Sequence, residues 1–237
     1  MTAGEHDGCH GVGPRRGGAP TGRRRLRREA WGFAIGSLCF LVGALPWYAD
    51  AVGPVWTAIT FLVGSIFFTL AAFIQLSLSG RAQQPTSDLG RADRLDWWAA
   101  AVQFGGTIAF NVSTGVALGA AIAQPDLLGA GWRPDAIGSI AFLVSSGLAL
   151  AATKDRGELW DPDARTWHGS VLGALGSVLF AISAVGAYVD PVTSTLVNAL
   201  WANAGTALGA ICFLVAAIVS RRAELLVEQE RATPIRS

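Results

Sequence analysis

The chain has 237 residues, of which 51% are hydrophobic and only 15% are charged, and its mean hydropathy is +0.42. This composition is more apolar than that of ordinary water-soluble domains and favours a membrane protein. The formal net charge is +1, so the composition does not indicate the concentrated basic face that a nucleic-acid partner would need. The three cysteines are too few and too scattered for a disulfide framework.

Residues 1–30 are rich in Gly, Pro and Arg and have no apolar periodicity, which predicts a disordered cytoplasmic tail. Five residues of types that bind transition metals lie in this tail: Glu5, His6, Asp7, Cys9 and His10. Their spacing matches no closed zinc site. We therefore expect neither a metal site nor a cofactor.

Six stretches of the chain contain no Asp, Glu, Lys or Arg. They are Trp31–Ala49, Pro54–Ser79, Trp97–Pro125, Ala136–Thr153, Thr166–Val189 and Pro191–Ser220. Each is close to or longer than the ~20 residues that a helix needs to cross the hydrocarbon core. In lipid the backbone polar groups must satisfy each other within the segment, so each span is expected to be helical. The sequence predicts an all-α, polytopic membrane protein with six transmembrane helices.

The basic residues predict the orientation of these spans. All of the 18 Lys and Arg residues except Arg133 lie in the two terminal regions or in the loops after the second and fourth spans. Because Lys and Arg near span ends are retained on the cytoplasmic side, both termini are expected to be cytoplasmic. Every basic residue except Lys154 is Arg, and Ala and Gly are abundant, which is typical of a high-GC bacterial genome. We expect a bacterial plasma membrane protein.

The first span could instead belong to a cleaved signal peptide. Residues 21–26 loosely resemble a twin-arginine signal, and Ala49-Asp50-Ala51 has the small-x-small form of a cleavage site. We favour a retained span, because this segment takes part in an internal repeat that cleavage would break.

The repeat is a glycine followed four residues later by phenylalanine, once in every span. The glycines are Gly36, Gly64, Gly106, Gly138, Gly176 and Gly209, and in five of the six copies the next residue is Ser or Thr. Gly36, Gly106 and Gly176 are spaced by 70 residues. This periodicity predicts three parallel two-helix hairpins, at 31–80, 97–153 and 166–220. Residues 221–237 form a second cytoplasmic tail, whose start is expected to prolong the last span as a helix along the cytoplasmic surface.

Glycine at a helix interface lets two backbones approach, and a phenylalanine one turn away fills the adjacent groove. We therefore assign the six repeated glycines to helix packing rather than to a path for substrate. Four Gly-x-x-x-Gly pairs support this role: Gly32/Gly36, Gly115/Gly119, Gly169/Gly173 and Gly205/Gly209.

With these motifs the sequence resembles the YrhK-like family of bacterial integral membrane proteins, whose units look like helical pairs with Gly-Ser-x-x-Phe signatures. The most similar stretches are Gln103–Thr114, Trp132–Ser146 and Ala202–Phe213. The resemblance implies a multi-pass membrane fold, and it brings no catalytic residues with it. Gly209-Ala210 departs from the signature, because Ser would be expected at residue 210.

All 17 acidic residues lie in tails, in loops or at span ends, which argues against an ion-coupled carrier. The candidate binding residues inside the membrane are neutral: Asn111, Ser113, Thr114 and Asn203. We favour hydrogen bonding between helices for these groups, and the alternative is that they line a path for a polar ligand or water.

No Ser-His-Asp, Cys-His or paired-carboxylate arrangement is visible, so the sequence predicts no catalytic residue and no enzyme. The expected function is that of a structural membrane protein whose partners are the lipid bilayer and either another membrane protein or further copies of itself. The alternative is a transporter or channel for a neutral or small polar solute.

Overall fold

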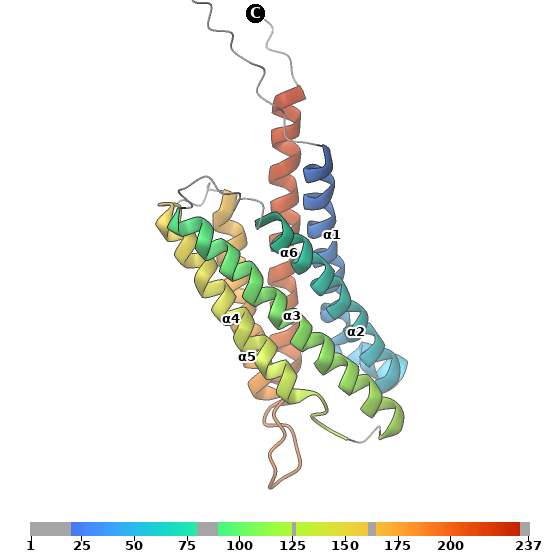
Figure 1. Cartoon of the computed structure of the whole chain (residues 1–237). Coiled ribbons are helices and arrows are strands. Elements are labelled where there is room, and N and C mark those ends of the chain that lie inside the picture. Colours follow the sequence, from blue (N-terminus) through green and yellow to red (C-terminus); the bar gives the residue numbers. More distant parts are fainter. Residues whose placement is uncertain (1–19, 80–89, 125–126, 161–164, 233–237) are drawn as a thin grey trace, which may run out of the picture.

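The computed structural model of the chain describes residues 20–79, 90–124, 127–160 and 165–232. These residues form six α-helices, which confirms the predicted all-α fold (Figure 1). The helices are α1 (Pro20–Gly43), α2 (Pro46–Ser79), α3 (Arg91–Ala123), α4 (Trp132–Asp155), α5 (Arg165–Gly186) and α6 (Ala199–Ala232). Five of them, α2 to α6, are long and apolar enough to cross a membrane.

The helices form a closed ring in which each one packs against two neighbours. Helices that are consecutive in the chain are in contact, and α6 returns to pack against α1. Successive helices run in opposite directions, so α1 begins and α6 ends at the same end of the bundle (Figure 1). We call this the basic end, because Arg91 and Lys154 lie there, at the start of α3 and the end of α4. Arg133 lies at the opposite end, which we call the far end.

Residues 20–30 are helical, which corrects the prediction of a disordered tail over residues 1–30. Proline at the first helical position sacrifices no hydrogen bond, and Arg, Leu, Glu and Ala all favour helices. An existing helix also extends without a new nucleation step. Residues 1–19, which include the five residues considered as metal ligands, lie outside the described part of the chain.

The C-terminal tail was also predicted to begin with a helix, and the helical prediction is confirmed. α6 continues without interruption to Ala232, and Figure 1 shows that this part runs straight on beyond the other helices. It keeps the direction of α6 and does not turn aside, as a course along the cytoplasmic surface would require.

The first predicted span, Trp31–Ala49, is longer than the helix that forms there. α1 ends at Gly43 and the chain turns before Pro46, because a proline disfavours the helical conformation of the residue before it. α2 then starts at Pro46 and is kinked at Gly53, whose φ of 80° lies in the left-handed region that favours glycine.

The last predicted span, Pro191–Ser220, also begins too early. Residues 187–198 form a loop in which Val189 and Leu196 pair as an isolated β-bridge, and α6 starts only at Ala199. The Asp190 carboxylate accepts a hydrogen bond from the backbone N–H of Val192 at 2.7 Å, which favours a turn over a helix. The absence of charge marks an apolar segment, but it does not specify a helix.

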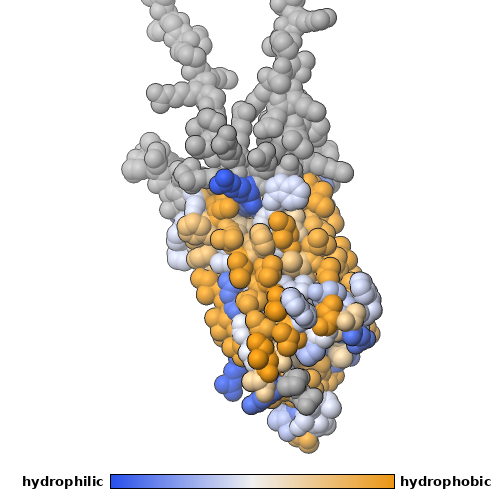
Figure 2. Space-filling model, turned by 90° about the vertical axis from the view of Figure 1, so that its right-hand side faces the viewer, coloured by the Kyte–Doolittle hydropathy of each residue, from blue (hydrophilic) through white to orange (hydrophobic). Residues whose placement is uncertain are grey.

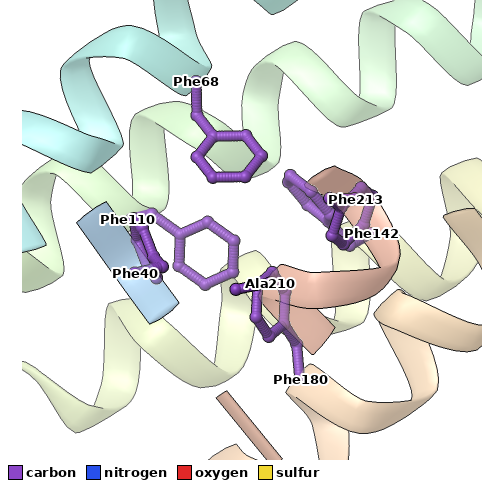
Figure 3. Packing of buried hydrophobic residues seen from close by; sticks show 7 residues of the cluster. All are labelled: Phe40, Phe68, Phe110, Phe142, Phe180, Ala210 and Phe213. Carbon is purple, nitrogen blue, oxygen red and sulfur yellow. The ribbon is translucent and has the colours of Figure 1, made fainter. Parts of the chain in front are cut away.

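Six phenylalanines, one from each helix, fill the centre of the bundle (Figure 3). They are the phenylalanines of the repeated motif: Phe40, Phe68, Phe110, Phe142, Phe180 and Phe213. Their exposed fractions range from 1% to 8%. The two rings of each consecutive helix pair have centroids 5.2–5.4 Å apart, and the rings of α1, α3 and α5 approach one another to 6.0–6.3 Å. These are ordinary distances for packed aromatic rings, so the described core is filled by side chains.

Each central phenylalanine packs against the motif glycine of its paired helix. A β-carbon on Gly106 would lie 2.9 Å from Phe142 Cδ2 and 3.2 Å from the Gly138 carbonyl oxygen. A β-carbon on Gly138 would lie 2.8 Å from Phe110 in the same way. The other four contacts are Gly36 with Phe68, Gly64 with Phe40, Gly176 with Phe213 and Gly209 with Phe180. A side chain larger than hydrogen would push each pair apart.

The Gly-x-x-x-Gly pairs behave in two ways. A β-carbon at Gly32 or Gly205 would also collide with the paired helix, so these two pairs pack as expected. The pairs Gly115/Gly119 and Gly169/Gly173 have open space within 4 Å, so the packing interpretation is wrong for them. The four-residue spacing places both glycines on one helix face, but it does not say which way that face points.

The sides of the bundle are covered by large apolar side chains, and Figure 2 shows a broad hydrophobic face. Val112, Ile140 and Leu208 on α3, α4 and α6 are each at least half exposed. Among the described residues, phenylalanines thus fill the inside of the bundle and large apolar side chains are exposed on the outside of its helices. The fold therefore fits a protein embedded in a membrane.

Candidate functional site

Asn111 lies at the interface of α2 and α3, where it bonds across to α2. Its Nδ2 donates a hydrogen bond to Thr69 Oγ1 at 2.8 Å, and Thr69 Oγ1 donates to the Ser65 carbonyl oxygen at 3.0 Å. The Oδ1 atom of Asn111 is buried and has no hydrogen-bond partner. One end of this amide thus links two helices, while the other end is an unsatisfied acceptor.

Thr114 lies one turn further along α3 and also bonds to α2. Its Oγ1 is 2.9 Å from Ser65 Oγ and 2.9 Å from the Phe110 carbonyl oxygen. The backbone of Ser113 lies against a different neighbour, since a β-carbon on Gly131, just before α4, would lie 2.4 Å from the Ser113 carbonyl oxygen. Asn111 and Thr114 therefore share the α2–α3 interface, and Ser113 belongs to the contact between α3 and the start of α4.

Asn203 lies apart from these three residues. It is exposed on α6, near the far end, and lines a groove of about 370 Å³ between α6 and the junction of α1 and α2. Asn198 has a different role, because its Oδ1 accepts a hydrogen bond from the backbone N–H of Trp201 at 3.0 Å and so caps the start of α6. The structure does not bring Asn203 and Asn111 to one interface.

The α4–α5 interface contains hydrogen bonds that the sequence did not single out. Ser146 Oγ lies 2.7 Å from Ser177 Oγ, and Thr153 Oγ1 lies 2.7 Å from Ser170 Oγ. Trp132 Nε1 donates to the Ala184 carbonyl oxygen at 2.7 Å. Serine and threonine are frequent in apolar helices. The ones that bond to a neighbouring helix could not be recognised from the sequence, because the sequence does not show which helix lies next to them.

The residue after each motif glycine is also buried in every helix. These residues are Ser37, Ser65, Thr107, Ser139, Ser177 and Ala210, and none is more than 2% exposed. Thr107 donates to the Phe104 carbonyl oxygen of its own helix at 2.7 Å, whereas Ser65 and Ser177 also reach a neighbouring helix. Ser37 Oγ is buried without a partner. A small side chain is therefore required here, and a hydroxyl is optional.

A charged contact joins α3 and the end of α4 at the basic end. The Arg156 guanidinium donates to the Asp96 carboxylate and lies 3.6 Å from the Asp93 carboxylate. The hydrogen bond with Asp96 raises the pKa of Arg156 above its ordinary value, although partial burial opposes this shift. Arg156 therefore keeps its charge at every pH at which the protein would be studied.

Hydroxyls and amides of this kind can hold helices in register or bind water and neutral polar solutes. Acyl or phosphoryl transfer would instead need a nucleophile paired with a base, and the four candidate residues include neither a histidine nor a carboxylate. The comparisons do not add a template, since no family model, no curated protein and no solved structure matches the chain.

Proposed function

We propose that the chain is a non-enzymatic membrane protein that crosses the bilayer six times as three parallel two-helix hairpins. The observation that supports this proposal most is the cluster of six phenylalanines, to which each hairpin contributes two rings. These rings occupy the axis along which a solute would have to pass. The polar groups lie instead between helices, where most of them bond to each other.

In this proposal α1 supplies the sixth span. Its Phe40 belongs to the central cluster, and its Gly36 packs against α2 as the corresponding glycines do elsewhere. The helix has 24 residues and is therefore about 36 Å long, which exceeds the ~30 Å of a hydrocarbon core.

The orientation in the bacterial plasma membrane follows from the basic end, which we assign to the cytoplasm together with both termini. Fusions to a phosphatase that is active only after export test this assignment. The reporter should be active after Asp50, Asp126 or Asp190 and silent after Asp88, Asp161 or Ser237. The reverse pattern, or activity after both members of a pair that flanks one span, would contradict the six-span topology.

A structural role means that the protein works by association, either with another membrane protein or with further copies of itself. The large apolar side chains on its sides offer the contact surface for this. Relationship to YrhK-like proteins is part of the same hypothesis, and it rests on the Gly-Ser-x-x-Phe signatures alone.

The alternative function is passage of a neutral or small polar solute. The observation that favours it is the unsatisfied Oδ1 of Asn111, because a buried acceptor without a partner is rare and can bind a polar ligand. A path along the α2–α3 interface would use this atom.

Two measurements distinguish the functions. Vesicles that contain the purified protein should swell in glycerol or urea no faster than protein-free vesicles if the role is structural. In a deletion strain of the source bacterium, Asn111→Leu should restore the parental phenotype, because Leu removes the amide together with its need for a partner. Faster swelling, or a folded Asn111→Leu protein that fails to complement, would favour the solute path instead.

A further inference from the structure

The groove beside Asn203 exists because α1 ends earlier than the helix next to it. α1 ends at Gly43 and the chain turns away at Pro46. At the same end of the bundle, α6 begins at Ala199 and so reaches further out than α1. The space left over is about 370 Å³, and small or apolar side chains line it. Its lining residues are Ala44, Leu45, Pro46, Ala199, Leu200, Asn203, Ala204 and Ala207.

The depth of the groove matches one leaflet of a bilayer. From Ala199 to Ala207 the helix rises about 12 Å, and half of a hydrocarbon core is about 15 Å. Trp47 and Trp201 adjoin the groove in sequence and are 66% and 49% exposed. Exposed tryptophan rings prefer the headgroup level, so the groove starts at the membrane interface and runs inward.

Asn203 is the exception in this apolar lining. Its side chain is exposed, and the described residues provide no hydrogen bond to it. Hydrocarbon cannot bond an amide, and leaving it unpaired costs free energy. Asn203 lies two residues, or about 3 Å, deeper in the membrane than Trp201. At this depth the ester groups of the lipids meet their acyl chains.

We propose that this groove binds one phospholipid from the leaflet at the far end of the bundle, with an acyl chain along the four alanines and an ester oxygen accepting a hydrogen bond from Asn203 Nδ2. The volume is at the lower limit of small-molecule sites, which suits one chain rather than two. None of the lining residues is charged. Binding therefore depends on the chain and the ester, and it does not depend on the charge of the headgroup.

The site can be tested by photo-crosslinking in vesicles of phosphatidylcholine that contain a trace of phosphatidylcholine with a photoactivatable acyl chain. Labelling of the parent protein should be concentrated on the α6 peptide that spans residues 199–207. Ala204→Trp, which fills the groove, should reduce this labelling to the level of the other lipid-facing helices. Leu208→Trp is the matched control, because Leu208 is half exposed on the same helix and does not line the groove, and it should label like the parent.

Asn203→Ala tests the amide without adding bulk, and it should lower labelling about threefold, the equivalent of one membrane hydrogen bond. Replacing phosphatidylcholine by phosphatidylglycerol, or adding salt, should leave the labelling unchanged. Uniform labelling of all lipid-facing helices, equal loss in Leu208→Trp, or a strong preference for the anionic lipid would overturn the proposal. A protein–protein crosslink from the α6 peptide to a second copy would also overturn it, because the groove would then be a subunit contact.

Discussion

The six helices form three pairs: α1 with α2, α3 with α4 and α5 with α6. The contacts within a pair differ from the contacts between neighbouring pairs. Within the pairs, glycine on each helix receives phenylalanine from the other, and Gly106 and Gly138 have no room for a β-carbon. Between the pairs no such glycine contact occurs among the described helical residues, although hydroxyls bond across, as Ser65 and Thr114 do. Hydroxyls also bond within pairs, since Ser145 Oγ donates to the Ala99 carbonyl oxygen at 2.8 Å. Glycine contacts thus set the distance within a pair, whereas between pairs only hydrogen bonds and apolar side-chain contacts are left to hold the helices in register.

The α1–α6 interface is the exception among the contacts between pairs. Ala210 and Ala44 stand at the sequence positions that correspond to Ser65 and Thr114, and both are buried. Ser37 on α1 is buried as well, and its Oγ has no hydrogen-bond partner. Around Ser37, Ala44 and Ala210 the described side chains form no hydrogen bond between α1 and α6, and the same interface carries the groove.

The largest loss of stability is expected from a substitution at a glycine that contacts the paired helix. Gly106→Leu should force α3 and α4 apart, because its side chain would overlap Phe142 and the Gly138 backbone, at a cost of more than about 3 kcal/mol. The neighbouring glycine is a matched control, since Gly105 has open space around it and Gly105→Leu should be tolerated. The measurement is the fraction of protein that stays monodisperse after detergent extraction and heating. Equal loss for both variants would mean that the motif glycine has no special packing role.

A smaller loss of stability is expected from truncating a phenylalanine at the centre of the bundle. Phe142 is 1% exposed and contacts five other rings or glycines of the cluster, so Phe142→Ala should leave a cavity. The side chain gains little from leaving lipid, so the loss is mainly that of packing contacts, about 2 kcal/mol. Thermal unfolding in one detergent gives the difference. Phe73→Ala is the control, because Phe73 is 56% exposed on α2 and should change the midpoint little.

The helices and the packing glycines could be predicted from the sequence because both depend on local information. Long uncharged runs locate the apolar helices, and a glycine followed four residues later by a phenylalanine indicates a packed helix face. Helix ends could not be predicted as well, since α1 ends before Pro46, inside one uncharged stretch, and α6 begins only after the loop 187–198, inside another. The partner of Asn111 is Thr69, 42 residues away, and no local pattern specifies such a contact.

The hydrogen bonds between pairs should contribute less than the steric contacts. A double-mutant cycle of Ser65→Ala and Thr114→Ala should give a coupling energy of about 0.6 kcal/mol, the average for membrane proteins. Placing Ser at both Ala44 and Ala210 extends the comparison to the α1–α6 interface. A similar coupling there would support the equivalence of the three hairpins, whereas no coupling would show that the α1–α6 interface has a different register. Both cycles can be measured by unfolding in mixed micelles.

The smallest effect concerns a polar contact within a pair, where steric fit already sets the distance. Arg156 bonds to Asp96 on α3, but both groups are partly exposed at the basic end, so solvent screens the pair. Asp96→Asn should therefore lower the unfolding free energy by only about 0.3 kcal/mol at low salt. Because the Debye length falls to about 3 Å in 1 M salt, the difference from the parent should vanish there. Arg156 stays charged throughout, so the variant and the parent should differ by the same amount from neutral pH to mildly alkaline pH. A loss as large as that of Gly106→Leu would mean that the ion pair, and not the glycine contact, holds α3 against α4.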